Sequence, residues 1–250
     1  MKKLIVSGDS CSDLNFRSPV HPDWDFSYKK WPEHLAEHLG MQLVCLGKGG
    51  SGNQYIYHSL LDQVLRTPKE EIGLVIAGWS QAMRKDWQAN DKWENTRLEQ
   101  DGNLFGWVNK TLRHYISFQI LCERYDLPYF HFQMGDVFES YLHGLKPSED
   151  EMLKGIDYKM SYPGDKQKDQ ERILNRIAEY DIVIDNFIGW PGLRDDYKEL
   201  GGGFNIMEKV LGNNLQTQLD NGLIVSELDD HPNEAGHKAI ANFLIKELEL

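Results

Sequence analysis

The decisive stretch of this sequence is Leu4-Ile5-Val6-Ser7-Gly8-Asp9-Ser10. The three consecutive apolar residues at its start predict a short buried strand. Gly8 then allows a tight turn, so Ser10 is expected to lie exposed at the carboxyl end of that strand. Ligands of open parallel sheets bind at the carboxyl ends of the strands. Ser10 is therefore a candidate for nucleophilic chemistry, provided that a base can take its proton.

The alternation of strand and helix continues along the chain. Apolar runs predict further strands, and helical periods between them predict helices. The expected strands cover residues 42–46, 72–77, 128–132 and 182–184, and the expected helices cover residues 31–40, 53–66, 105–125, 169–180 and 232–248. This alternation predicts an α/β protein with a parallel sheet of about five strands and helices on both faces.

The domain organisation follows from what interrupts this pattern. We find no internal repeat, no low-complexity tract and no linker, so residues 1–250 are interpreted as a single domain. Residues 143–170 are charged and contain several Gly and Pro residues, which predicts a surface insertion or lid. Residues 79–102 are polar and contain Trp, and their pattern predicts neither helix nor strand.

Composition excludes several classes of function. The 250 residues contain 27 Lys and Arg against 39 Asp and Glu, a net charge of −12, which argues against a nucleic-acid partner or docking on an anionic membrane. No apolar run reaches the roughly 18–20 residues of a membrane span. The N-terminus does not resemble a signal peptide, and the three Cys form no CxxC motif. We expect a cytoplasmic protein, with non-classical export or association with a particle left open.

A base for Ser10 is predicted near the other end of the chain. His231 precedes Pro232 and the last expected helix, and Asp229 and Asp230 precede His231 directly. One carboxylate can accept the Nδ1–H of the imidazole, which leaves Nε2 available to a hydroxyl. This arrangement of nucleophile, base and orienting acid requires that the two ends of the chain meet.

Two further turns are candidates for stabilising an oxyanion. The second expected strand is followed by Gly47-Lys48-Gly49-Gly50-Ser51-Gly52-Asn53, whose glycines bring backbone N–H groups close to a ligand. The third is followed by Gly78-Trp79-Ser80, in which Ser80 can donate a hydrogen bond and Trp79 can line a pocket.

These four blocks together resemble the SGNH (GDSL-type) hydrolases, in the block order of that family and over nearly the whole chain. The resemblance implies a flavodoxin-like three-layer α/β/α fold and serine esterase chemistry without a metal or cofactor. It implies that Ser10 is the nucleophile and an oxyanion donor through its N–H. It likewise implies that Gly50 is the second oxyanion donor and that His231 is the base.

Two positions depart from the family pattern. The third block of the family reads Gly-x-Asn, whereas this chain has Ser80 there, and Asn53 is an alternative donor. The last block of the family reads Asp-x-x-His, whereas the residue three before His231 is Leu228. We assign the orienting role to Asp229, because a side chain adjacent to the His tends to point away from it.

The expected function is hydrolysis of a small acyl ester, with an acetylated carbohydrate as one possible substrate. The Trp residues that suit a sugar face are Trp79, Trp87, Trp93, Trp107 and Trp190. The alternative is a catalytically weak or inactive SGNH-like binding module in a larger assembly, motivated by the two departures. The sequence does not indicate an oligomeric state.

Two rival motifs are weaker. Gly47-x-Gly49-x-x-Gly52 matches a dinucleotide fingerprint, but the next expected strand does not end on the acidic residue that such a site needs. His34-x-x-Glu37-His38 matches a zinc-peptidase string. On the expected helix these histidines flank an apolar stripe, so we interpret them as residues at the boundary of the core.

Overall fold

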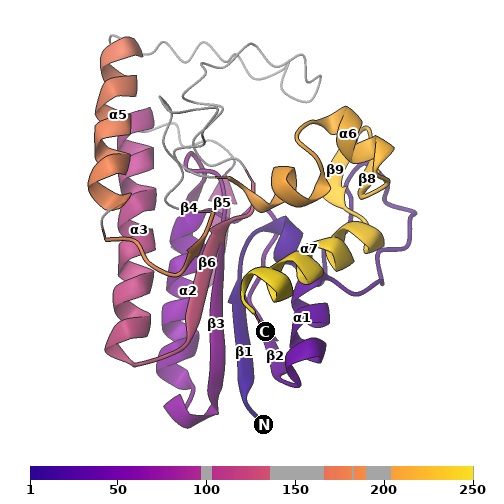
Figure 1. The fold of residues 1–250 in the computed structure, drawn as a ribbon, viewed down its shortest axis with the longest axis horizontal. Coiled ribbons are helices and arrows are strands. Elements are labelled where there is room, and N and C mark those ends of the chain that lie inside the picture. The colour runs from indigo at the N-terminus through magenta and orange to yellow at the C-terminus, as the bar shows by residue number, and fades with distance from the viewer. Residues whose placement is uncertain (97–102, 136–165, 182, 190–203, 250) are drawn as a thin grey trace.

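The computed structural model describes residues 1–96, 103–135, 166–181, 183–189 and 204–249. Its centre is a parallel sheet of five strands in the order β2-β1-β3-β6-β7, as the sequence predicted (Figure 1). The strands are β1 (Lys3–Ser7), β2 (Gln42–Cys45), β3 (Ile72–Trp79), β6 (Tyr129–Gln133) and β7 (Phe187–Ile188).

Side-chain alternation along the central strands assigns residues to the two faces of the sheet. On β1, Ile5 packs into one apolar cluster, and its neighbours Leu4 and Val6 pack into the other. On β3, Val75 joins the cluster of Ile5, and Leu74 joins that of Leu4. Both faces of the sheet are therefore buried, which is why these strands consist of continuous apolar runs.

Helices cover both faces and complete three layers (Figure 1). One face carries α2 (Asn53–Arg66), α3 (Leu104–Arg124) and α5 (Lys166–Asp181), and the other carries α1 (Trp31–Leu39) and α7 (Glu234–Glu247). Because α1 follows β1 and α7 is the last helix, the two ends of the chain pack against each other on one face.

The prediction of a strand at residues 182–184 was wrong. The fifth strand is β7, five residues further along, and it pairs with β6 through His131 and Phe132. The end of α5 explains the difference, because the N–H groups of Val183 and Ile184 both donate to the carbonyl of Tyr180. These residues complete the helix end, and Ile184 is buried in the apolar cluster rather than paired in the sheet.

The stretch 79–102 contains a hairpin that the sequence pattern did not reveal. Strands β4 (Lys85–Ala89) and β5 (Lys92–Thr96) pair antiparallel. Asn90 and Asp91 connect them at φ 50° and 61°, the left-handed region that a two-residue type I′ turn requires. Asn and Asp tolerate that region better than other residues with side chains, and this was the missed signal.

The remaining elements are short. A second hairpin consists of β8 (Ile224–Ser226) and β9 (Asp229–Pro232). The helical turns are η1 (Ser10–Ser12), η2 (Lys69–Glu71), η4 (Met207–Leu211) and α6 (Leu215–Asp220). Of the predicted insertion at residues 143–170, positions 143–165 lie outside the described residues, and the rest belong to α5.

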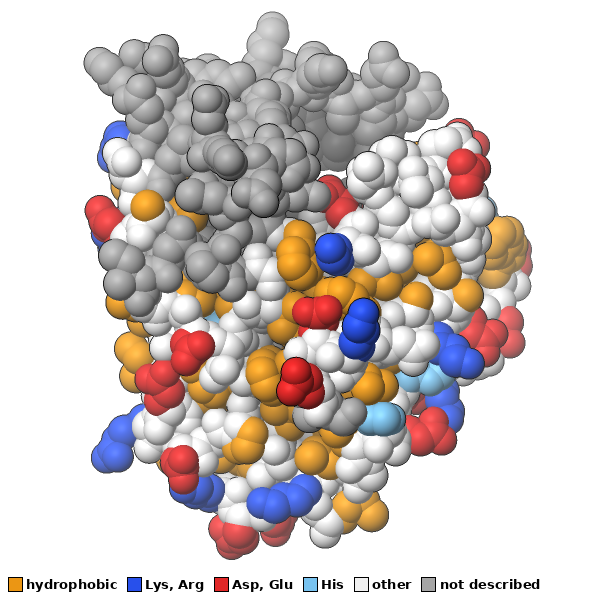
Figure 2. Space-filling model, in the orientation of Figure 1, with side chains coloured by type: hydrophobic (Ala, Val, Ile, Leu, Met, Phe, Trp, Pro, Cys, Tyr) orange, Lys and Arg blue, Asp and Glu red, His pale blue; other side chains and the backbone are white. Residues whose placement is uncertain are grey.

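On the face drawn in Figure 2, the described basic side chains are scattered among acidic ones and do not gather into a single patch. Within the described part of the chain, no helix combines the length and apolar character needed to cross a membrane.

Candidate active site

Ser10 lies at the carboxyl end of β1, as expected. The strand ends at Ser7, and η1 begins at Ser10. Asp9 caps this short helix, because its Oδ1 accepts the N–H of Cys11 at 3.1 Å. Gly8 is required by close approach, since a Cβ there would lie 2.3 Å from Ser12 Oγ. A larger residue at position 8 would therefore have to displace Ser12.

The structure brings the two ends of the chain together at Ser10. The hydroxyl Oγ of Ser10 lies 2.8 Å from Nε2 of His231. Nδ1 of the same imidazole lies 2.5 Å from Oδ1 of Asp229. With Nδ1 donating to Asp229, Nε2 accepts a hydrogen bond from the Ser10 hydroxyl. These three side chains thus form a continuous hydrogen-bonded chain from hydroxyl to carboxylate.

The β8–β9 hairpin positions His231. Asn233 fixes the hairpin to α7, since its Oδ1 accepts the N–H of Gly236 at 3.0 Å and its Nδ2 donates to the carbonyl of Ile224 at 2.9 Å. Phe16 covers one face of the imidazole, with ring centroids 4.1 Å apart and planes 23° apart. The imidazole is held by Asp229 at one edge and by Phe16 on one face.

Of the two candidate acids, Asp229 is the one in contact with His231. Its side chain is 3% exposed, whereas that of Asp230 is 72% exposed with Oδ1 4.0 Å from Nδ1. Burial alone would raise the pKa of Asp229, but hydrogen bonds from His231 and Ser18 outweigh burial and lower this pKa to about 2. Asp229 is therefore a carboxylate at neutral pH and can accept the Nδ1–H of His231.

Within the described ranges, one group of His and acidic side chains has the spacing of metal ligands, and it consists of Asp229, Asp230 and His231. In this group Nδ1 of His231 already contacts Asp229, and Nε2 contacts Ser10. His34 and His38 of the zinc-like string are not members of it.

The glycine-rich turn after β2 is held by the β4–β5 region. The guanidinium Nη1 of Arg84 donates to the carbonyl of Ser51 at 3.1 Å, and Nδ2 of Asn95 donates to the carbonyl of Gly49 at 3.4 Å. Gly50 itself has φ +76°, and a Cβ there would lie 2.8 Å from Asn95 Oδ1. Neither the N–H of Gly50 nor that of Ser10 has an acceptor among the described residues.

Asp86 on β4 occupies the start of α2. Its carboxylate accepts the N–H groups of Gly52 at 2.8 Å and Tyr55 at 2.9 Å. In a dinucleotide site these N–H groups would bind the pyrophosphate. Because a buried carboxylate already caps this helix, the Gly47-x-Gly49-x-x-Gly52 turn does not fit that alternative.

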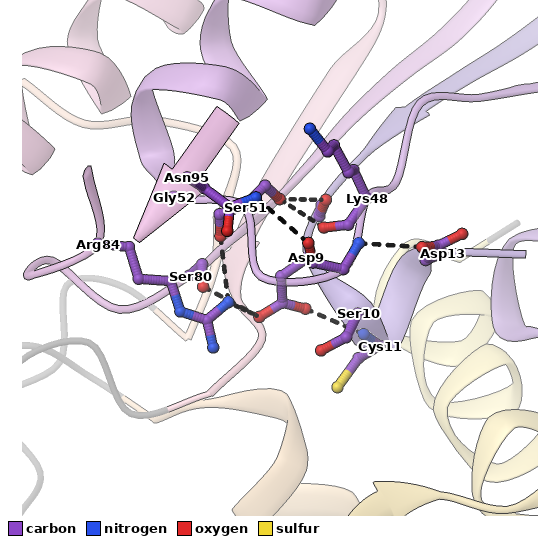
Figure 3. Close-up of polar contacts among 12 residues, drawn as sticks. Asp9, Ser10, Cys11, Asp13, Lys48, Ser51, Gly52, Ser80, Arg84 and Asn95 are labelled. Atoms are coloured by element: carbon purple, nitrogen blue, oxygen red, sulfur yellow. Dashed lines mark hydrogen bonds and ion pairs between the residues drawn. The ribbon is translucent and has the colours of Figure 1, made fainter. Parts of the chain in front are cut away.

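Neither predicted side-chain donor is available to an oxyanion. The hydroxyl of Ser80 is buried and donates to Oδ2 of Asp9 at 3.0 Å (Figure 3). The Nδ2 of Asn53 donates to the carbonyl of Ser80 at 2.9 Å and to Thr111 Oγ1 at 3.1 Å, and its Oδ1 accepts the N–H of Ser80. Asn53 thus fastens the turn after β3 to α2, and the expectation that either residue supplies the side-chain donor does not fit these contacts.

The expectation that Trp79 lines a pocket was wrong. Trp79 is fully buried, packs against Tyr115 with the ring planes tilted by 39°, and donates its Nε1–H to Nδ1 of His131 at 3.1 Å. It belongs to the apolar core because it is the last residue of a central strand, with α3 above it. Trp107 is buried in the same core, and Trp190 lies outside the described residues.

Arg84 is the residue in this region that the sequence did not single out. Its side chain is 10% exposed, and Nη1 lies 3.5 Å from Oδ2 of Asp9 (Figure 3). Its Nε is buried and has no hydrogen-bond partner among the described residues. The signal was absent because Arg84 lies in the stretch that had no recognisable pattern, and its partner Asp9 is 75 positions away.

Comparison with known proteins supports the fold. Neither family models nor curated proteins gave a match to the sequence. Among solved structures, the psychrotrophic esterase EstA from a Pseudoalteromonas species is similar at a TM-score of 0.51 and 10% identity, with 100% of this chain and 97% of that chain covered. A member of the lipolytic protein G-D-S-L family from Veillonella parvula is similar at a TM-score of 0.47 and 14% identity, with 100% and 98% covered.

At such low identity, the similarity to the esterase shows the fold alone. Together with the strand order β2-β1-β3-β6-β7 and the helices on both faces, it shows a three-layer α/β/α fold like that of this esterase. The sequence motifs predicted this fold.

Proposed function

We propose that this chain is a serine-dependent hydrolase of O-esters, with Ser10 as the nucleophile, His231 as the base and Asp229 as the orienting acid. The observation that carries the proposal is the hydrogen-bonded chain of Ser10 Oγ, the His231 imidazole and Asp229, with contacts of 2.8 and 2.5 Å. A serine hydroxyl is a weak nucleophile until a neighbouring base can take its proton, and this arrangement supplies that base.

The proposed reaction has two halves. As Oγ of Ser10 attacks the ester carbonyl, Nε2 of His231 takes the hydroxyl proton, and the carbonyl electrons move onto the oxygen. The resulting oxyanion is held by the N–H groups of Ser10 and Gly50. His231 then protonates the departing alcohol and leaves an acyl group on Ser10. In the second half, His231 takes a proton from water, the hydroxide attacks the acyl-serine, and the acid is released as Ser10 regains its proton.

We propose a small acyl ester as the substrate class, with an acetylated carbohydrate as the narrower candidate. Fewer tryptophans than expected can face a sugar, because Trp79 and Trp107 are buried in the core. Trp87 on β4 remains 41% exposed, and Trp93 on β5 packs against Tyr55 and His58.

The second candidate function is a binding module that retains the pocket without turnover. One observation favours it: the side chains of Ser80 and Asn53 are both committed to internal hydrogen bonds. Loss of one oxyanion donor reduces the rate by about 10²–10³-fold, so a site that lacks its side-chain donor would be slow.

Hydrolysis of p-nitrophenyl acetate by Ser10→Ala and Ser12→Ala proteins tests the proposal. Ser12 is the matched control, because it is buried two residues away and its Oγ has no hydrogen-bond partner in the described chain. We expect Ser10→Ala to reduce hydrolysis to the background of the buffer and Ser12→Ala to retain it. Equal rates for Ser10→Ala and the parent would contradict the proposed mechanism. Binding of an unreactive ester analogue without any Ser10-dependent turnover would identify the binding module.

A further inference from the structure

The oxyanion side of the proposed site has two backbone N–H donors, and neither Ser80 nor Asn53 adds a side-chain donor to them. An acyl-transfer site stabilises the oxyanion with preorganised hydrogen-bond donors. The N–H groups of Ser10 and Gly50 are the backbone candidates, and the side chains of Ser80 and Asn53 are turned inward. A side-chain donor to the oxyanion, as in the family pattern, would therefore have to come from elsewhere in the chain.

Arg84 lies where such a donor is needed. Its Nη1 contacts Oδ2 of Asp9, the residue before Ser10, and the carbonyl of Ser51, the residue after Gly50. The guanidinium thus bridges the immediate neighbours of both backbone donors. In Figure 3 the Asp9 carboxylate lies between Arg84 and Ser10. The tip of the Arg84 guanidinium and the hydroxyl of Ser10 both lie below this carboxylate in the view.

The largely buried charge of Asp9 is paired with the Arg84 guanidinium. The Asp9 side chain is 9% exposed, and its residue precedes the nucleophile directly. A second negative charge on the oxyanion would be repelled by this buried carboxylate. The guanidinium of Arg84 offsets that repulsion from the other side of Asp9. The same two charges act on the neighbouring Cys11, whose pKa is raised first by burial and then by Asp9, while Arg84 opposes the shift.

Arg84 also retains donor capacity. Its Nε is buried without a partner among the described residues, and leaving a buried donor unpaired is costly. Arginine has five N–H donors in a planar fork, of which the contacts to Asp9 and Ser51 use only those of Nη1. An oxyanion that forms beside this group would satisfy part of the remaining capacity.

We propose that Arg84 is a catalytic residue of the ester hydrolysis proposed above, which supplies the side-chain oxyanion donor in place of an amide. As Ser10 attacks, the carbonyl oxygen gains the electron pair of its double bond, and the guanidinium donates a hydrogen bond to it without losing a proton. When the carbonyl re-forms, this contact weakens. The inference rests on the proposed function and adds to it the group that compensates for Ser80.

Steady-state kinetics of Arg84→Met, Arg84→Lys and Arg66→Met test this role. Arg66 is the control, because it is an exposed cation at the end of α2 whose partner is Asp62 of the same helix. We expect Arg84→Met to lower kcat by about 10²–10³-fold with KM changed only slightly. Arg84→Lys keeps the charge and is expected to recover part of that loss, and Arg66→Met is expected to retain kcat.

A second measurement separates oxyanion contact from support of the fold. A trifluoromethyl ketone adds to a serine as an anionic tetrahedral adduct, whereas the corresponding methyl ketone binds as a neutral ground-state analogue. We expect Arg84→Met to weaken the trifluoromethyl ketone by the same factor as kcat/KM and to leave the methyl ketone unchanged. Equal weakening of both ketones, or an unchanged kcat, would overturn the proposal.

Failure of the proposed function is distinguishable from failure of this inference. If the parent protein shows no turnover that depends on Ser10, both proposals fall. If Ser10-dependent turnover is present and Arg84→Met retains it, only the role of Arg84 falls. Arg84→Lys serves as the second variant should Arg84→Met fail to fold, which circular dichroism and a melting curve would detect.

Discussion

The two sides of Ser10 are built from the chain in different ways. On one side, His231 and Asp229 lie two positions apart on a single short strand, β9. On the other side, the contacts come from the segments around Asp9, Gly49, Asn53 and Arg84, which lie on different elements and contribute one or two hydrogen bonds each. The proposed proton-transfer groups His231 and Asp229 are local in sequence, whereas the proposed oxyanion side is assembled by the fold.

This difference determines how strongly a substitution on each side of Ser10 is expected to affect the proposed activity. In the proposed mechanism, a substitution at His231 or Asp229 on β9 would remove the base or its orienting acid. A substitution on the proposed oxyanion side would remove one of several contacts, because several segments reach the same turn. The position of Ser80, where the family pattern has an amide, lies on the side that tolerates replacement.

The largest expected effect comes from removing the base. We expect His231→Ala to lower kcat for p-nitrophenyl acetate by about 10⁶-fold, because the members of a triad act as a unit. Steady-state kinetics with purified protein measure the change. A decrease of less than tenfold would mean that the proton of Ser10 goes to another group and that the contrast between the two sides is incorrect.

A smaller effect is expected from the orienting acid. Asp229→Asn preserves the shape of the residue but removes the charge that stabilises the imidazolium formed during the reaction, so we expect kcat to fall by about 10⁴-fold. Asp230→Asn is the control, because its side chain is 72% exposed and 4.0 Å from the imidazole. Equal losses in the two variants would contradict the assignment of Asp229.

The sequence predicted the fold and the local contacts at Ser10 better than the contacts that distant segments assemble. The alternation of strands and helices gave the sheet and its layers, because continuous apolar runs mark strands that are buried on both faces. The contact between Ser10 and His231 followed from placing both at the carboxyl end of the sheet, and the structure has these side chains 2.8 Å apart. Their catalytic roles remain predictions.

The oxyanion side was beyond the reach of sequence patterns. Whether Ser80 and Asn53 face a substrate depends on hydrogen bonds to Asp9 and Thr111, which are distant in sequence and carry no periodic signal. Arg84 was missed for the same reason. Trp79 was misassigned because a Trp that ends a strand has the same appearance in sequence whether it lines a pocket or packs under a helix.

A third test acts on the hairpin that holds the glycine turn. Asp86→Ala removes the cap of α2, so we expect the free energy of unfolding to fall by about 0.5–2 kcal/mol, as measured by urea denaturation. Asp62→Ala is the matched control, since Asp62 is an exposed carboxylate on the same helix. If the two variants are equally stable, the hairpin does not hold the turn through Asp86.

The proton-transfer side offers a comparably mild test. Phe16 stacks on the imidazole of His231, and an aromatic pair contributes about 0.5–1.5 kcal/mol. We therefore expect Phe16→Leu to lower kcat by up to about tenfold while KM changes little. An increase in KM with kcat unchanged would instead place Phe16 in substrate binding.

The smallest expected effect concerns pH and stability. Burial lowers the pKa of His131 and of His237 to about 3, whereas an unfolded His titrates near 6.5. Between these values the unfolded chain binds more protons than the folded chain, so stability falls as pH falls through 6.5 toward 3. From pH 7 to pH 6 we expect a loss of roughly 0.5–1 kcal/mol for each buried His, measured by urea denaturation. Constant stability over this interval would contradict the burial of these neutral imidazoles.

The most direct test of the account is labelling with a fluorophosphonate, followed by mass spectrometry of the digested protein. The reagent needs a serine whose proton is taken by a neighbouring base. We predict one adduct per chain on the peptide that contains Ser10, and strongly reduced labelling in His231→Ala. Labelling at another residue, or no labelling of a protein that still hydrolyses p-nitrophenyl acetate, would contradict the account.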